Sequence, residues 1–239
     1  MQLVCEAEKV LSSRFEQFDQ IAFTNQEKVL TTLQSHSVQD THFNTSTGYG
    51  YDDRGRDDLE SIYAQVFGAE DAMVRSQIVS GTHAISACLL GILRPGDELI
   101  SVVGSPYDTL GNVIGKNHPA SGTLIERGIK YREIPLTPNM RPDIQSIGAS
   151  VGSQTRMVLI QRSRGYTLRP ALTVSQIEEL TAAVKNANPR TIVMVDNCYG
   201  EFTDIIEPPQ VGHRPDGRFF DKKSRWGIST SGWLHYRQP

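Results

Sequence analysis

The chain has 239 residues, of which 38% are hydrophobic and 21% charged, and its formal net charge at pH 7 is −3. This composition suits one or two soluble α/β domains, and the absence of a basic stripe or a block of like charge argues against a nucleic-acid or membrane-surface partner. Three widely spaced cysteines cannot form a disulfide framework, and no signal peptide or membrane-length apolar run is present. We therefore expect a cytoplasmic protein.

The first segment, residues 1–45, is predicted to be helical. Apolar residues recur there at helical spacing: Leu11, Phe15, Phe18 and Ala22. Thr24 followed by Glu27 has the spacing of a capping box, which predicts that a second helix begins at this point. Residues 41–55 are rich in Thr, Asn, Gly and Tyr, and we expect an exposed loop.

Residues 46–211 alternate between predicted helices and strands. Helices are expected near residues 57–67 and 84–93, and a capping box at Thr173 and Gln176 opens another. Strands are expected at residues 73–79, 99–103, 131–134, 157–160 and 192–195, most of them apolar runs typical of strands buried on both faces. The pattern predicts an α/β fold with a mostly parallel sheet and helices on both faces.

Polar residues follow three of these strands, where ligands bind in open α/β sheets. Ser80, Gly81 and Thr82 stand between a strand and a helix, and the free backbone N–H groups of Gly81, Thr82 and His83 would favour a phosphate. An ordinary helix cap at Ser80 or Thr82 is the alternative. Tyr107 follows the next strand, where its ring could either stack on a flat heteroaromatic ligand or lie half-buried under a loop.

Asp196 closes the last apolar strand, where an unpaired carboxylate is costly. A protonated ring nitrogen would compensate that charge, as pyridoxal phosphate (PLP) chemistry requires. Metal ligation is the alternative, although no His or Cys spacing nearby supports it. Cys198 is interpreted as a packing residue. A nicotinamide-binding Rossmann protein is disfavoured because no Gly-x-Gly-x-x-Gly follows the first strand.

Six stretches together resemble the methionine γ-lyase-like group often called aluminium-resistance proteins, a branch of fold-type I PLP enzymes. They begin at Gly48, Gln77, Leu93, Pro106, Gln161 and Val195, and read GYGYDDRGRD, QIVSGTHA, LRPGDE, PYDTL, QRSRGY and VDNCYGEF. The likeness runs from near the start to about Gly212, somewhat over half of a complete family member. It implies a PLP-dependent transferase fold-type I large domain over residues 46–211 that is incomplete, because the C-terminal small domain is absent.

The resemblance also implies roles for the cofactor-binding residues. Ser80, Gly81 and Thr82 would hold the phosphate of PLP, Tyr107 would stack on its ring, and Asp196 would pair with its nitrogen. In related lyases, a loop similar to residues 51–54 reaches into a neighbouring subunit and binds its phosphate.

The aligned residues of that loop are Tyr51 and Arg54, and Tyr49 is an alternative to Tyr51. A homo-oligomer, a dimer or tetramer, is accordingly expected for the intact family member. Arg162 and Arg164 would bind a substrate carboxylate or support loop structure, the structural role being preferred.

Residues 212–239 depart from the family pattern. Family members have a Ser-Leu-Ile-Lys-Asn-Pro-Gly-Gly-Gly motif here, whose lysine forms the Schiff base with PLP. This chain reads Asp-Lys-Lys-Ser-Arg-Trp-Gly, so Lys222 lies at the expected place in the wrong context. One choice of synonymous codons for that heptapeptide, read one base later, encodes Ile-Lys-Asn-Pro-Gly-Gly. We hypothesise a frameshift near residues 211–214 that leaves an aberrant, disordered tail.

The function that the resemblance implies is that of a PLP-dependent carbon–sulfur lyase acting on a sulfur amino acid such as methionine, cysteine or cystathionine. A PLP-dependent aminotransferase is the second reading, because it uses the same cofactor cradle. A non-catalytic truncated product is the third interpretation, and it describes the chain as written best. No metal is expected.

Overall fold

The computed structural model describes residues 1–46, 51, 53–116, 118 and 120–211, together with the backbone of two short strands at 228–229 and 233–234. Its helices are α1 (Gln2–Ser35), α2 (Arg54–Phe67), α3 (Gly81–Ile92), α4 (Asp108–Ile114), α5 (Ile144–Ser150) and α6 (Val174–Ala187), with 3-10 turns η1 (Asp40–Phe43) and η2 (Pro208–Gln210). Its strands are β1 (Met73–Val74), β2 (Glu98–Ser101), β3 (Lys130–Glu133), β4 (Thr155–Gln161), β5 (Ile192–Asp196), β6 (Ile228–Ser229) and β7 (Trp233–Leu234).

The described strands form one sheet in the order β1-β7-β6-β5-β4-β2-β3. Strands β3, β2, β4, β5 and β6 are parallel, and only the pairings of β7 are antiparallel. The predicted α/β fold with a mostly parallel sheet is confirmed. The chain passes from β2 outward to β3 and then back to β4 on the other side of β2, which creates a topological switch point between β2 and β4.

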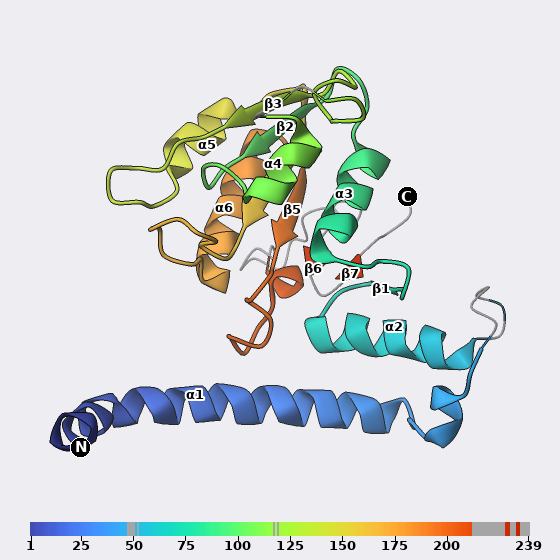
Figure 1. Cartoon of the computed structure of the whole chain (residues 1–239), viewed down its shortest axis with the longest axis vertical. Helices are drawn as coiled ribbons and strands as arrows, with labels where there is room; N and C mark the ends of the chain where they lie inside the picture. The colour runs from blue at the N-terminus through green and yellow to red at the C-terminus, as the bar shows by residue number, and fades with distance from the viewer. Residues whose placement is uncertain are drawn as a thin grey trace.

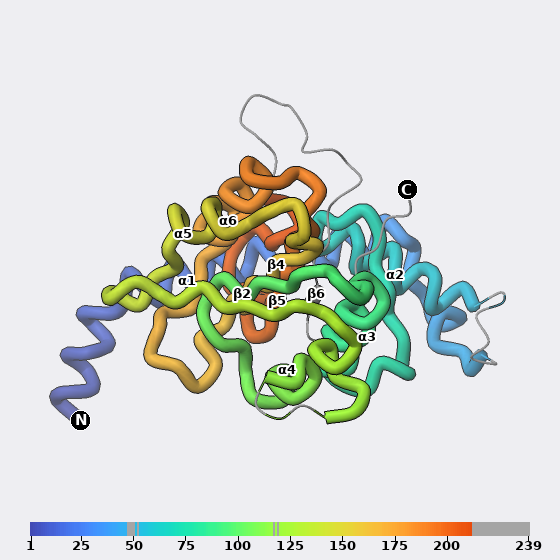
Figure 2. The backbone as a smooth tube through the Cα atoms, turned by 90° about the horizontal axis from the view of Figure 1, so that it is seen from above, coloured from blue at the N-terminus to red at the C-terminus, as the bar shows by residue number. Residues whose placement is uncertain are grey.

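Helices cover both faces of the sheet, with α3 and α4 on one side and α5 and α6 on the other (Figure 1, Figure 2). One cluster of buried side chains joins α3 and α4 to the sheet and includes Leu89 and Leu99. A second cluster joins α5 and α6 to the opposite face and includes Ile147 and Ile177. Strands β4 and β5 are buried along almost their whole length, which explains their nearly unbroken apolar sequences.

The N-terminal segment is one continuous helix, so the predicted second helix start at Thr24 is wrong. The Thr24 hydroxyl donates to the carbonyl of Gln20 (2.9 Å), one turn earlier, and so does not cap a new helix. The apolar residues that predicted an amphipathic helix remain on a largely uncovered face, with Phe15 46% and Phe18 51% exposed. Helix α1 lies along α2, away from the sheet (Figure 1).

Two other boundaries differ from the prediction. The strand expected over residues 73–79 pairs only at Met73 and Val74, and its last residues form a turn that leads to α3. The loop expected over residues 41–55 contains part of η1 and the first two residues of α2. The capping box at Thr173 and Gln176 is confirmed, with both reciprocal bonds formed.

The segment predicted to be a disordered tail contributes strands β6 and β7 to the sheet. Ile228 of β6 pairs with Asp196 at the end of β5, and β7 bridges β6 and β1. The other residues of 212–239 lie outside the described part of the chain, so the prediction of disorder there stays a prediction.

Candidate active site

The first part of the site is the N-terminus of α3. Ser80 is its N-cap, and its side chain accepts the backbone N–H of His83 (3.1 Å). The interpretation of Ser80 as a helix cap is therefore correct, but the Ser80 side chain pairs with only one of the free N–H groups at this helix terminus. The N–H groups of Gly81 and Thr82 have no protein acceptor within the described residues, and the helix dipole adds partial positive charge there. This terminus is suited to an anion.

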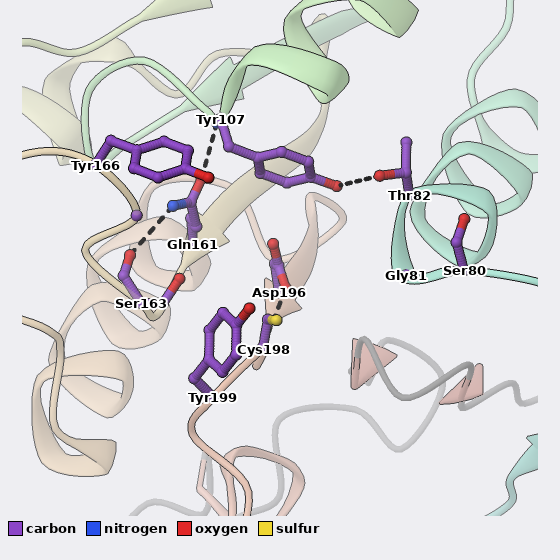
Figure 3. Close-up of a pocket in the computed structure, with 11 residues that line it drawn as sticks. Ser80, Gly81, Thr82, Tyr107, Gln161, Ser163, Tyr166, Asp196, Cys198 and Tyr199 are labelled. Atoms are coloured by element: carbon purple, nitrogen blue, oxygen red, sulfur yellow. Dashed lines mark hydrogen bonds between the residues drawn. The ribbon is translucent and has the colours of Figure 1, made fainter.

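The second part lies at the switch point between β2 and β4. Tyr107 follows β2 and precedes α4, and its backbone N–H donates to Oε1 of Gln161, the last residue of β4 (3.1 Å). The Tyr107 hydroxyl lies 3.2 Å from Oγ1 of Thr82, so the ring spans the gap between α3 and the sheet (Figure 3). Burial raises the pKa of this hydroxyl, which remains protonated at neutral pH.

The third part is Asp196, the last residue of β5, whose side chain faces the same space (Figure 3). It is 2% exposed, and its Oδ1 accepts the backbone N–H of Cys198 (3.1 Å). Burial raises the pKa of Asp196 to about 6, with a smaller contribution from the charge of Glu201, while the Cys198 N–H opposes the shift. Among the described residues no cation pairs with this carboxylate.

These groups line one cavity of about 370 Å³. Its walls are Ser80, Gly81, Thr82, Tyr107, Gln161, Ser163, Gly165, Tyr166, Asp196, Cys198 and Tyr199. Ser80, Gly81, Thr82, Tyr107 and Asp196, the five residues proposed from the strand ends, therefore come together in space. The chain thus supplies, in this order, a helix N-terminus suited to an anion, an aromatic ring and a carboxylate to the wall of one cavity.

The remaining predicted site residues do not join them. Tyr51 is 84% exposed, Arg54 begins α2 with its Nε 3.4 Å from Asp58, and neither lines the cavity of its own chain. Tyr49 and Lys222 lie outside the described residues.

Six lining residues were not assigned to the site from the sequence, and one of them, Cys198, was interpreted as a packing residue. Gln161 carries the same signal as Asp196, a polar residue that closes an apolar strand, and could have been found by it. Cys198 and Tyr199 follow Asp196 directly, and Ser163, Gly165 and Tyr166 belong to the turn after β4. Nothing in the spacing of that turn indicates that it folds back over the cavity.

The two arginines beside this turn differ in their surroundings. Arg162 is 4% exposed, and its guanidinium donates to the carbonyls of Leu172 and Gly200 and to Asn197 Oδ1. It is a structural residue, as preferred from the sequence. Arg164 is exposed and lines a second hollow of about 390 Å³, which shares part of its wall with the first cavity.

Comparison with known proteins agrees with this geometry. The model of the family described as Methionine gamma-lyase matches residues 1–215. This chain belongs to the methionine γ-lyase family. The uncharacterized protein YnbB of Bacillus subtilis (strain 168) is 47% identical over 208 residues, which are 87% of this chain and 49% of YnbB.

Solved structures give the same result. A Listeria innocua protein is 50% identical, with a TM-score of 0.84 over 88% of this chain and 52% of that chain. A carbon-sulfur lyase involved in aluminum resistance from Clostridium novyi NT is 42% identical, with a TM-score of 0.82 over 87% of this chain and 50% of that chain. The fold is the large-domain fold of fold-type I PLP-dependent enzymes, and the chain spans about half the length of these relatives.

Two further observations concern the described residues alone. None of their helices is both long and apolar enough to cross a membrane. Nor do they bring together three or more His, Cys, Asp or Glu side chains in a group that could hold a metal ion.

Proposed function

We propose that this chain carries the PLP cradle of a carbon–sulfur lyase that acts on a sulfur amino acid such as methionine, cysteine or cystathionine. The observation that carries the proposal is Asp196, a buried carboxylate that faces a cavity and has no cation beside it among the described residues. Such a group is stabilised by a ligand that brings a positive charge.

The residues present fit the cofactor. The N–H groups of Gly81 and Thr82 would bind its phosphate, the Tyr107 ring would contact the face of its pyridine ring, and Asp196 would hold a proton on the ring nitrogen. When bound, PLP supplies an electron sink for negative charge that develops on the substrate. Asp196 strengthens that sink because an ionised carboxylate keeps the nitrogen protonated.

The exposed Tyr51 and Arg54 have a place in the same proposal. In a homo-oligomer, the loop that carries them would reach the cavity of a neighbouring subunit and add a cation beside the phosphate, and a cytoplasmic location would suit such an enzyme. Lys222 stands in a different sequence context from the family's Schiff-base lysine. For the chain with this sequence we therefore propose noncovalent PLP binding without turnover.

The test is a titration of the full chain with PLP, followed by equilibrium dialysis and by the cofactor's absorbance. We expect saturable 1:1 binding, and an Asp196→Asn variant should bind at least about tenfold more weakly because the charged hydrogen bond contributes about 1.5–3 kcal/mol. Glu179→Gln, which removes a carboxylate exposed on α6, should bind like the unmodified chain.

Borohydride reduction followed by peptide mass analysis reports whether any lysine holds PLP covalently. Absence of binding by a folded chain, or equal binding by Asp196→Asn, would refute the proposed cradle. A reduced adduct on Lys222 would refute the noncovalent mode while leaving the cradle in place.

A further inference from the structure

The turn that follows Asp196 has an unusual backbone. Tyr199 (φ 63°) and Phe202 (φ 58°) are both left-handed, a conformation that bulky side chains rarely adopt. Two such residues within four positions persist only where the surrounding structure dictates them. Tyr199 lines the cavity, so this turn forms part of the candidate site.

Arg162 holds the turn from the side of β4. Its Nη1 donates to Asn197 Oδ1 and to the Gly200 carbonyl, each at 2.8 Å, and its Nη2 donates to Thr203 Oγ1 at 3.1 Å. The fit leaves no room for a side chain at Gly200, where a Cβ would lie 2.5 Å from Arg162 Cδ. Three positions of the turn are thus fixed by one guanidinium.

Glu207 also holds the turn, through other atoms. It is 0% exposed, and its Oε1 accepts the backbone N–H of Phe202 (2.7 Å), one of the two left-handed residues. Its Oε2 accepts a hydrogen bond from Nδ2 of Asn197 (3.2 Å) and lies 3.9 Å from Arg162 Nη1. The Asn197 side chain is therefore anchored at both ends, by a cation at its oxygen and by an anion at its nitrogen.

This buried network is connected to Asp196 through the backbone. The N–H of Arg162 donates to the Asp196 carbonyl (2.9 Å), which fixes the end of β5. Asn197 is the next residue, and the peptide that follows it carries the Cys198 N–H that donates to Asp196 Oδ1. Whatever holds the Asn197 side chain also sets the direction of that N–H.

We propose that Arg162 and Glu207 are positioning residues, which anchor Asn197 so that the Cys198 N–H stays on the Asp196 carboxylate and keeps it ready for a cationic ring. The inference rests on the proposed PLP cradle and adds residues that make no contact with the cofactor. It also explains why a buried carboxylate and guanidinium stand 3.9 Å apart instead of in direct contact: each is used on Asn197 and on the turn.

The consequence is a pH dependence that a purely structural pair would not produce. The groups that face Asp196 are Tyr107, from the segment before α4, and Cys198 and Glu201, from the turn itself. The Cys198 N–H lowers the pKa of Asp196, so loss of that bond raises it. PLP binding needs the ionised carboxylate and weakens up to about tenfold for each pH unit below that pKa.

The experiment measures PLP affinity of the full chain from pH 5 to pH 8. In the unmodified chain we expect affinity to begin falling near the Asp196 pKa of about 6. In Glu207→Gln only one acceptor oxygen remains for the two donors, Asn197 Nδ2 and the Phe202 N–H, so one of them faces an NH2 group and the turn loosens. The bend should then move upward by roughly half to one pH unit, with about a threefold to tenfold loss of affinity at pH 5. Asp196→Asn supplies the baseline that lacks this titration.

Two controls separate positioning from loss of stability. Ile147→Ala destabilises the core under α5 without removing any hydrogen bond of the turn, and should leave the bend unchanged. Thr203→Val, at an exposed residue, removes the acceptor of Arg162 Nη2 and the hydroxyl's own bond to the Gly200 carbonyl. It serves if Glu207→Gln does not fold, and should move the bend by a smaller amount in the same direction. Weaker binding in either variant with an unmoved bend would overturn the inference, whereas an unmodified chain that does not bind PLP would overturn the cradle itself.

Discussion

The Asp196 carboxylate is expected to destabilise the cofactor-free chain, and Asp196→Asn tests this directly. Its pKa is raised from 3.8 to about 6 in the fold. At about 1.4 kcal/mol per unit of pKa difference, the ionised carboxylate costs the folded state up to about 3 kcal/mol above pH 6. The asparagine oxygen can still accept the Cys198 N–H, so we expect the variant to be about 1–3 kcal/mol more stable at pH 7.5.

The sign of the pH dependence is fixed by the direction of the shift. A carboxyl whose pKa is higher in the folded state favours folding when it is protonated, so its cost is complete above pH 6 and disappears as the pH falls towards 3.8. Urea unfolding at pH 7.5 and at pH 4 should therefore give a large difference between the two proteins at the higher pH and little at the lower. Saturating PLP should narrow the difference at pH 7.5 by about 1.4 kcal/mol or more, because the unmodified chain binds it at least about tenfold more tightly and is stabilised correspondingly more.

An Asp196→Asn variant that is less stable at pH 7.5 without PLP would refute the reasoning. It would show that the carboxylate has a stabilising partner in the free chain. A gain in stability that stays constant down to pH 4 would equally contradict it, since the effect would then not arise from ionisation.

Other predictions concern the packing of α2 and α3. A Cβ at Gly55 would lie 2.2 Å from the carbonyl oxygen of His42, so Gly55→Ala should displace η1 and lower the free energy of unfolding by about 1–3 kcal/mol in the urea assay. Gly91 is in an open position of α3, so Gly91→Ala should raise the free energy of unfolding by about 0.5–1 kcal/mol in the same assay. Burial raises the pKa of Cys88 to about 12, so iodoacetamide at pH 8 should modify the exposed Cys5 and leave Cys88 intact until the chain unfolds; equal rates in native buffer would contradict this.

The sequence predicted the central fold because its strands are buried on both faces. Continuous apolar runs at residues 157–160 and 192–195 correspond to β4 and β5, and each proved only one to three residues longer. An unbroken apolar run of this kind directly reflects the burial of a strand on both faces. The length of β1 was overestimated because a strand extends only as far as its neighbour pairs with it, here β7, and no local sequence pattern indicates where that neighbour lies.

Helix α1 shows a different limit. Thr24 and Glu27 match a capping box, but the same hydroxyl bonds equally well to a carbonyl one turn earlier inside a helix, and local sequence does not distinguish the two. The apolar stripe through Phe15 and Phe18 correctly indicates a helix, yet it says nothing about which surface covers it.

The candidate site was predictable where one residue departs from its surroundings. Asp196 was found because a carboxylate ends an apolar strand, and Gly81 because it opens a helix beside Ser80 and Thr82. Tyr166 and Tyr199 could not be found in this way, since they reach the cavity through turns whose conformations are set by distant contacts. The left-handed conformation of Tyr199, for example, depends on a turn that Arg162 and Glu207 hold from positions far away in the sequence.

The same physical conflict links the stability of this chain to its proposed function. Without a ligand, the folded chain is expected to be more stable with an uncharged residue at position 196. The buried network of Arg162, Asn197 and Glu207 is needed because the turn contains two left-handed residues. Such departures from local rules concentrate at sites where a ligand supplies the missing interaction. Around Asp196 the missing interaction is a positive charge, and the cavity beside it is lined by an aromatic ring and an anion-binding helix terminus. A pyridinium ring that carries a phosphate satisfies all three.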